Sequence, residues 1–221
     1  MAEKMPIAVL ISGRGRTLKN ILDKVDEGKL DVAVKLVVAS TPNASGIQYA
    51  EKANIPVAVV ERSNFPDITS FSEAVFSPCK RSRAKYVVMA GYLSLLEIPE
   101  NFENRVLNIH PSLIPSFCGK GFFGRSVHEA ALKKGVKVSG CTVHFVDNEY
   151  DNGPIILQKV VPVLEDDTTD SLSDRVLYDA EFVAYPEALQ LLAEGRVRVE
   201  EVPSGAGIRK IVRILDRPAE E

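Results

Sequence analysis

The first half of the chain alternates between short apolar runs and stretches in which apolar residues recur every three or four positions. Apolar runs rich in β-branched residues predict buried parallel strands, and they occur at residues 6–12, 32–40, 56–60, 86–90 and 106–110. After the first run, Leu18, Ile21 and Val25 recur at helical spacing and predict a helix that ends at Gly28. Weaker helical patterns cover residues 45–53 and the region around 71–75, which is expected to end near Pro78. Strands that alternate with helices predict a parallel sheet.

The second half of the chain has a different pattern. Residues 136–147 alternate in polarity and predict a half-buried strand, and a polar turn at 148–154 leads into another apolar run at 155–163. Because no helix separates these two strands, we expect an antiparallel pair. Residues 170–192 predict a long helix, and 197–202 a last strand. The N-terminal cap of this helix is expected at Thr169 or Asp170. The residues of the helix expected to face inward are Leu172, Val176, Ala180 and Val183.

These elements predict an α/β fold of the Rossmann-like, three-layer kind, with a mostly parallel sheet and an antiparallel C-terminal part. A length of 221 residues fits one domain with a substantial core. We place that domain at residues 1–203 and an extension of low stability at 204–221.

Composition excludes several classes of function. A net charge of −3 and a pI of about 5.8 give no general affinity for nucleic acid. No apolar run approaches the roughly 20 residues of a membrane span. The three cysteines lack metal-ligand spacing, and an odd count without a signal peptide predicts a reducing cytoplasm.

The apolar run at 106–110 carries two polar residues at its end. Asn108 and His110 alternate along a strand and therefore share one face, and Pro111 ends the pairing. The carboxyl ends of strands in an open α/β sheet border the ligand crevice. A carboxamide beside an imidazole can stabilise an oxyanion and supply a proton. A buried histidine that is simply hydrogen-bonded is the alternative, and the residues alone leave both interpretations open.

A glycine-rich turn, residues 13–17, joins the first strand to the first helix. Backbone amides at such a helix N-terminus can bind an anion, although the turn lacks the third glycine of a dinucleotide-binding motif. A single phosphate on the amides of Gly15, Arg16 and Thr17 is the functional interpretation. Glycines present only for turn geometry are the alternative.

Two further segments attract attention. Residues 116–125 combine three glycines with three phenylalanines, which predicts a flexible active-site loop, and His128 after it is expected on the surface. Residues 93–96 form an apolar exit from the fourth strand. They belong either to the core or to the wall of a pocket for a flat ring.

The motifs LNIHPSLIP (residues 107–115) and GCTVHFVDNEYDNGPIILQ (residues 140–158) resemble those of the folate-dependent formyltransferases of purine synthesis. The resemblance extends over about residues 6–202. It implies direct transfer of a formyl group from 10-formyltetrahydrofolate, as co-substrate, to the primary amine of glycinamide ribonucleotide. It implies no metal, no nucleic-acid or membrane partner, and a monomer or homodimer.

The resemblance also assigns residues to roles. The catalytic residues are Asn108, His110 and Asp151. The residues that bind the ribonucleotide are Gly13, Gly15, Arg16, Thr17, Pro111 and Glu181. The residues that bind the folate are Leu93, Ser94, Leu95, Leu96, Val143, His144, Val146, Asn148 and Asp151. In the implied mechanism, Asn108 and protonated His110 stabilise the oxyanion, while Asp151 assists the proton transfer.

The chain departs from the family pattern at three places. The arginine that many relatives use for the substrate phosphate would fall near Ile68, where there is none, and Arg16 could replace its charge. Ser94 stands where the family has an arginine. One extra residue lies between Arg175 and Tyr185.

Three alternatives remain open. A formyltetrahydrofolate hydrolase would share the three polar residues, but such relatives carry an extra N-terminal domain, for which we expect no room before residue 6. A methionyl-tRNA formyltransferase would have a C-terminal RNA-binding domain. A non-catalytic folate- or nucleotide-binding protein would need no matched acid and base.

Overall fold

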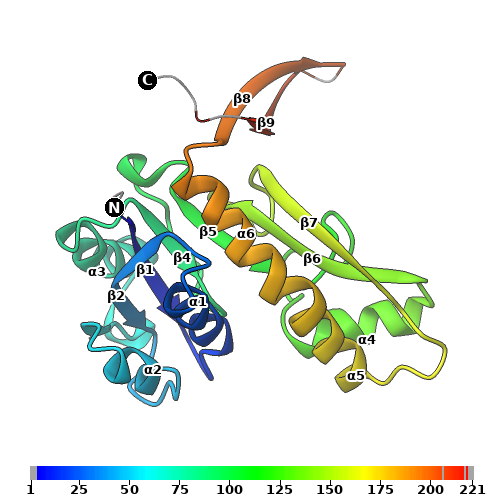
Figure 1. Ribbon diagram of the computed structural model, residues 1–221, viewed down its shortest axis with the longest axis horizontal. Helices are drawn as coiled ribbons and strands as arrows, with labels where there is room; N and C mark the ends of the chain where they lie inside the picture. The colour runs from blue at the N-terminus through cyan, green and yellow to red at the C-terminus, as the bar shows by residue number, and fades with distance from the viewer. Residues whose placement is uncertain (1–3, 206, 217, 219–221) are drawn as a thin grey trace. The chain divides into compact units, whose positions relative to one another are not determined.

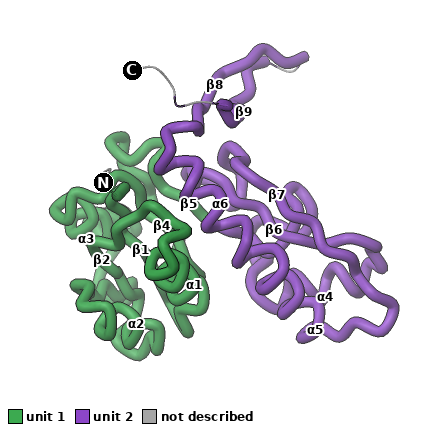
Figure 2. The backbone as a smooth tube through the Cα atoms, in the orientation of Figure 1, with its two compact units in different colours: residues 1–108 green, residues 109–221 purple. Residues whose placement is uncertain are grey.

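The computed structural model describes residues 4–205, 207–216 and 218. The chain divides into two compact units, residues 1–108 and 109–221 (Figure 2), so that the boundary falls inside strand β5. Among the described residues, the larger sheet has the strand order β3-β2-β1-β4-β5-β6-β7, and a smaller sheet pairs β8 with β9. The predicted mixture of a mostly parallel sheet with an antiparallel C-terminal part is confirmed.

The first unit contains the parallel part of the sheet (Figure 1). Its strands are β1 (Met5–Ile11), β2 (Val32–Ala39), β3 (Val57–Val59), β4 (Tyr86–Met89) and most of β5 (Val106–His110). Every pairing among them is parallel. Its helices are α1 (Arg16–Asp26), α2 (Ile47–Lys52) and α3 (Ile68–Arg81), with short 3₁₀ turns at Arg62–Asn64 and Glu100–Phe102.

Burial explains why these segments adopt these elements. Ile7 and Leu10 of β1 are fully buried, as are Leu18 and Ile21 on one face of α1, so the helical spacing seen in the sequence packs that face into the core. Helix α3 passes through Pro78 to Arg81, and the predicted end near Pro78 is wrong. Proline removes one helix hydrogen bond, but burial of the residues on either side, among them Phe76 and Cys79, favours continuation.

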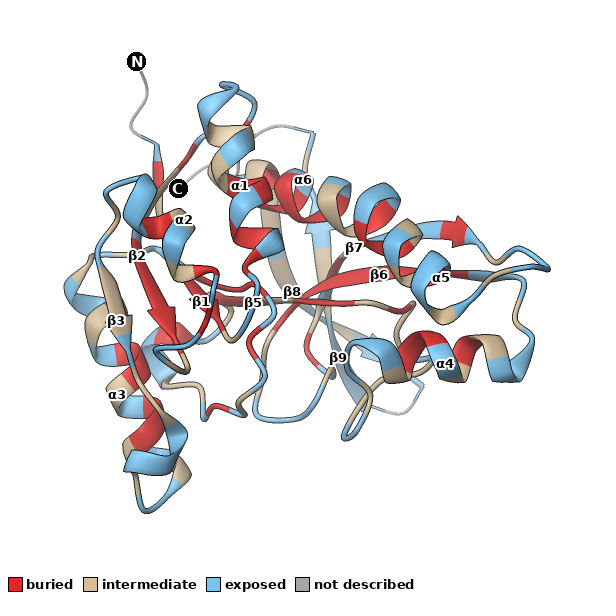
Figure 3. Ribbon diagram, turned by 90° about the horizontal axis from the view of Figure 1, so that it is seen from below, coloured by how far each residue is buried: buried red, intermediate tan, exposed pale blue. Residues whose placement is uncertain are grey.

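The second unit contains the antiparallel part. Its elements are α4 (Arg125–Lys134), β6 (Val138–Phe145), β7 (Ile155–Pro162), α5 (Thr169–Arg175), the π-helical segment η3 (Val176–Glu181), α6 (Phe182–Ala193), β8 (Val197–Ser204) and β9 (Gly207–Ile214). Both strand pairs are antiparallel. Strand β6 is buried on both faces from Ser139 onward (Figure 3), so the prediction of a half-buried strand is wrong. Helical segments η3 and α6 contact it, and Thr142 is covered by the chain around Ser112 and Ile114.

The predicted long helix is three consecutive helical segments with a π-helical turn in the middle. Its cap is Thr168, which forms a reciprocal capping box with Ser171, and not Thr169 or Asp170. The inward positions are correct up to Ala180, whereas Val183 is 47% exposed. A π-helical turn holds more residues than an α-helical one, so it rotates the residues that follow it.

The C-terminal hairpin β8–β9 spans the domain boundary that we predict at residue 203. Residues 206, 217 and 219–221 of the predicted extension lie outside the described residues. The division into a domain and an extension therefore stays a prediction. Among the described residues, no helix is long and apolar enough to cross a membrane.

A bidentate ion pair between Arg175 and Asp167 fixes the start of α5. Arg175 donates to both carboxylate oxygens of Asp167, at 2.5 and 2.7 Å, and to the Pro162 carbonyl at 3.0 Å. The Asp167 side chain is only 3% exposed. Hydrogen bonds from Arg175 hold the pKa of the Asp167 carboxyl well below its usual value. Two parallel bonds of this kind are the strong form of an arginine–carboxylate contact.

We predict that Arg175→Met lowers the free energy of unfolding at pH 7 by about 2 kcal/mol, between the values for exposed and for fully buried ion pairs, because the pair is only partly buried. Because the pKa of Asp167 is depressed, the contribution of the pair is fully present above about pH 4, the ordinary aspartate pKa. It is lost as the pH falls from there toward the folded-state pKa. Urea denaturation followed by circular dichroism should show the difference between variant and wild type shrinking below pH 4.

The exposed Arg125–Asp170 pair provides the control, because its side chains are 60% and 75% exposed. Arg125→Met should change the unfolding free energy by less than about 1 kcal/mol. Equal losses in the two variants would contradict the prediction.

Candidate active site

Strand β5 places Asn108 and His110 at its end. Val106 and Leu107 are fully buried, and Met89 of β4 pairs with Asn108 in the parallel register. Asn108 and His110 alternate along the strand, which gives their side chains the same face. His110 is 4% exposed. The interpretation as a merely buried histidine depends on what surrounds the ring.

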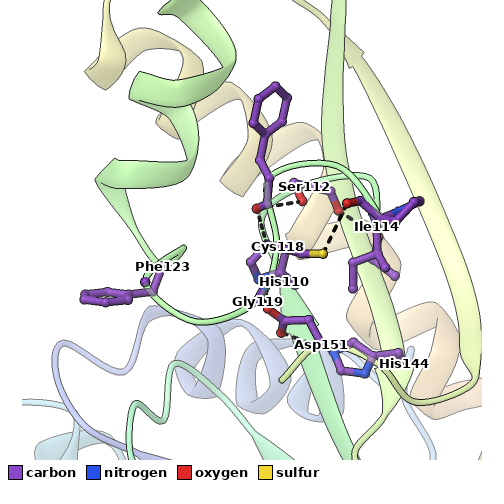
Figure 4. Close-up of polar contacts among 12 residues, drawn as sticks. His110, Ser112, Ile114, Cys118, Gly119, Phe123, His144 and Asp151 are labelled. Atoms are coloured by element: carbon purple, nitrogen blue, oxygen red, sulfur yellow. Dashed lines mark hydrogen bonds and ion pairs between the residues drawn. The ribbon is translucent and has the colours of Figure 1, made fainter. Parts of the chain in front are cut away.

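Both ring nitrogens of His110 face acceptor atoms (Figure 4). Nε2 lies 2.9 Å from the carbonyl oxygen of Phe117, and Nδ1 lies 3.5 Å from Oδ2 of Asp151. A carbonyl can only accept, so Nε2 carries a proton. A neutral ring would then direct a lone pair from Nδ1 at a carboxylate. The arrangement therefore suits a doubly protonated imidazolium beside a negative charge.

Asp151 is held by the turn between β6 and β7 and by the loop after β5. Its side chain is 11% exposed, and its backbone has a φ of 53°, a left-handed conformation that aspartate tolerates better than most residues. Oδ2 accepts from the Gly119 amide at 2.8 Å. Gly153 lets the turn approach β6, because a Cβ there would lie 2.0 Å from the Phe145 carbonyl oxygen.

A second histidine, His144 of β6, lies on the other side of Asp151. Its Nε2 is 3.8 Å from Oδ1 of Asp151, and its Nδ1 donates to the Phe145 carbonyl at 2.8 Å. Burial lowers the pKa of His144, because loss of water disfavours the charged form. His144 is therefore neutral near pH 7.

The third histidine is buried as well. His128 of α4 is 3% exposed, which corrects the expectation of a surface residue, because the face of α4 that carries it packs inward with Val127 and Ala131. Burial lowers the pKa of His128 to about 4, and the charges of His110 and Arg125 act in the same direction. Near neutral pH it carries no charge.

In the first unit, the glycine-rich turn closes tightly between β1 and α1. Gly15 has a φ of 67°, and a Cβ on it would lie 2.6 Å from the Cα of Gly46, whose amide donates to Gly13. Turn geometry thus requires glycine here. Helix α1 has no side-chain cap and no acidic residue in its first turn. An uncapped, positively polarised N-terminus can bind an anion. The structure is therefore compatible with both interpretations of the turn, the phosphate site and turn geometry alone, and the phosphate site stays a prediction.

The predicted folate segment after β4 is only partly core. Leu93 and Leu95 are 66% and 38% exposed, whereas Leu96 is buried. The Leu93 amide donates to the Ser12 hydroxyl at 3.0 Å, which also accepts from Ser40. The segment therefore belongs only partly to the core, and its role as a folate surface stays a prediction.

The structure thus brings His110, His144 and Asp151 together within the second unit. That unit also contains Pro111, Val143, Val146, Asn148 and Glu181. The first unit contains Asn108, Gly13, Gly15, Arg16, Thr17 and Leu93, Ser94, Leu95, Leu96. The sequence did not predict the contacts of the Phe117 carbonyl and the Gly119 amide, because every residue has these backbone groups. Only the glycines of the loop indicated that its backbone could approach the site. Within the described residues, no cluster of His, Cys, Asp or Glu could hold a metal ion.

Comparison with known proteins places this site in context. Residues 5–189 match the family model described as formyl transferase. The solved structure of glycinamide ribonucleotide transformylase 1 from Symbiobacterium toebii is 41% identical, with a TM-score of 0.86 and coverage of 98% of this chain and 96% of that one.

Curated relatives agree with that match. The trifunctional purine biosynthetic protein adenosine-3 of Gallus gallus is 40% identical over 200 residues, which cover 90% of this chain and 19% of the relative. The chloroplastic phosphoribosylglycinamide formyltransferase of Vigna unguiculata is 38% identical, over 89% of this chain and 64% of that protein. The chain thus spans about a fifth of the trifunctional relative. It belongs to the formyl transferase family.

Proposed function

We propose that this protein transfers the formyl group of 10-formyltetrahydrofolate to the primary amine of glycinamide ribonucleotide. One observation carries the proposal: His110 stands between the Phe117 carbonyl and the Asp151 carboxylate, with both ring nitrogens directed at acceptors. Family membership supports formyl transfer, and the names of the relatives favour glycinamide ribonucleotide as the acceptor.

The residues suit direct acyl transfer. The amine attacks the formyl carbon, a carbon–nitrogen bond forms, and the formyl oxygen becomes an oxyanion. The Asn108 amide and the cationic His110 stabilise that oxyanion, because preorganised donors in a water-poor site act most strongly where charge develops. As the bond to N10 of the folate breaks, Asp151 assists transfer of the proton from the amine to N10. This route needs no covalent enzyme intermediate.

Neighbouring groups keep these roles separate. The Phe117 carbonyl holds Nε2 of His110, so Nδ1 is the nitrogen directed at Asp151 and the reacting atoms. The distance of 3.5 Å from Nδ1 to Oδ2 is too long for a strong hydrogen bond. A substrate oxygen can therefore share the Nδ1 proton. His144 is neutral and leaves the negative charge of Asp151 to His110.

We propose the turn at residues 13–17 as the site of the ribonucleotide phosphate, and Glu181 as the contact for its amine end. Leu93 to Leu96 and the turn before Asp151 would bind the folate, which fits the exposed leucines of that segment. We also propose a cytoplasmic protein, since Cys79, Cys118 and Cys141 are all free thiols. We propose no nucleic-acid partner, in line with the net charge of −3. A monomer or a homodimer is compatible with this site.

The decisive experiment separates transfer from hydrolysis. Purified protein is incubated with 10-formyltetrahydrofolate, with and without glycinamide ribonucleotide, and both tetrahydrofolate and formate are measured. A transferase releases tetrahydrofolate only when the ribonucleotide is present and forms its formyl derivative. Release of formate without the ribonucleotide would indicate a hydrolase, and no turnover with retained binding would indicate a binding protein.

We predict that Asp151→Asn lowers kcat by about 10²-fold or more, in line with the typical contribution of roughly 10²–10⁴-fold from general acid–base catalysis. The change keeps the shape of the side chain and removes its charge. The KM values should change little, because the lost interaction matters mainly in the transition state. Steady-state kinetics with both substrates checks this, with Glu165→Gln as the control for loss of an exposed carboxylate outside the proposed site. A near-normal kcat in a folded Asp151→Asn variant would contradict the prediction and show that Asp151 serves only the geometry of the turn.

We predict that Arg16→Ala raises the KM of the ribonucleotide by about ten- to a hundredfold, the value of a charge-assisted hydrogen bond of roughly 1.5–3 kcal/mol. The KM of the folate should stay close to that of the wild type. Arg14→Ala provides the matched control, because Arg14 is an exposed arginine of the same turn outside the helix. Similar effects of the two variants, or of Arg16→Ala on the two substrates, would reject a phosphate contact at Arg16.

A further inference from the structure

We infer that Thr142 is a positioning residue for His110, a role that rests on the proposed function of that histidine. Thr142 lies on β6 and is fully buried. Its Oγ1 donates to the Ser112 carbonyl at 2.7 Å and accepts from the Ile114 amide at 3.0 Å and from Nε2 of Gln158 at 3.0 Å. A hydroxyl has one proton to donate and two lone pairs, so its hydrogen-bonding capacity is filled.

Gln158 completes a clamp on the chain that follows His110. It is the cross-strand neighbour of Thr142 in the β6–β7 pair. Its Nε2 also donates to the Ile114 carbonyl at 3.1 Å. Residues 112 and 114 are therefore held through both main-chain carbonyls and one amide by two adjacent side chains.

Ser112 transmits this constraint to the loop. Its side chain is almost completely buried, and its Oγ donates to the Ser116 carbonyl at 2.5 Å and lies 3.4 Å from the Phe117 carbonyl oxygen (Figure 4). The Phe117 carbonyl in turn receives Nε2 of His110 at 2.9 Å. A continuous series of hydrogen bonds thus connects Thr142 to the imidazole without Thr142 touching it.

The conformation of Phe117 shows that this segment needs such support. Phe117 has a φ of 49°, a left-handed conformation that is uncommon for a bulky residue. Such conformations persist where the surrounding contacts enforce them. The clamp therefore sets the position of the Phe117 carbonyl and, through it, the direction in which Nδ1 points.

The test is the isosteric change Thr142→Val, which removes all three hydrogen bonds and keeps the side-chain shape. We expect kcat to fall by about ten- to a hundredfold, because a small misplacement of a catalytic group has effects of this order. The KM values of both substrates should stay within about twofold, because no residue of the clamp belongs to the proposed binding sites. Thr142→Ser retains the hydroxyl and should restore most of kcat.

A second readout reports on His110 directly. The chain has three histidines, so ¹⁵N-edited NMR of the imidazoles gives few signals, which single His→Gln variants assign. In the wild type, the Nε2 proton of His110 should exchange slowly. In Thr142→Val it should exchange faster and shift, while the signals of His128 stay in place. Ser139→Ala is the matched control, because Ser139 is a buried hydroxyl of the same strand and no contact joins it to the loop among the described contacts.

Each outcome decides the inference. A loss of kcat with an unmoved His110 signal, or an unchanged kcat and signal, overturns it. Should Thr142→Val not fold, Gln158→Met removes part of the clamp at a more exposed position, and a smaller change of kcat and His110 signal in the same direction supports the inference. If the wild-type protein proves inactive, the proposed function fails, while the NMR comparison still tests whether Thr142 positions His110.

Discussion

The buried contact between the Asp151 carboxylate and the His110 ring is the interaction on which the rest of the site depends. A carboxylate that is 11% exposed needs a partner charge and hydrogen bonds, because burying an unpaired charge is costly. Asp151 accepts a hydrogen bond from the Gly119 amide, and the proposed imidazolium of His110 faces it at 3.5 Å. The left-handed backbone of Asp151, the close approach of the turn to β6 at Gly153 and the loop after β5 together position the carboxylate beside the ring.

Burial distinguishes the histidines of the chain and so determines which one can carry charge beside Asp151. Loss of water lowers the pKa of His144 and takes that of His128 to about 4, so neither competes for the carboxylate near neutral pH. His110 has the same kinds of partner as His144, a main-chain carbonyl and the Asp151 carboxylate, but its ring lies nearer to the carboxylate, at 3.5 Å against 3.8 Å. Environment, rather than residue type, assigns the chemistry.

The scaffold alone does not select the reaction, since one fold supports many activities and function depends on the site. What is specific here is a pair of features: an imidazole held from one side by a main-chain carbonyl, and a carboxylate held by a loop amide. Because both holding groups come from residues 116–125, the order of that loop and the competence of the site are linked. Glycines at positions 119, 121 and 124, all with positive φ, allow the loop to take this course.

Local patterns of the sequence already determined much of the molecule. The parallel strands, the end of β5 with Asn108 and His110, and the turn that carries Asp151 follow from apolar runs and turn residues that are close together along the chain. Only the tertiary structure decided that β6 is buried on both faces, that His128 is internal, and that Thr142 supports the loop. The physical reason is that these features join residues distant in sequence, often through backbone amides and carbonyls. Every residue has those groups, so no pattern of side chains announces them.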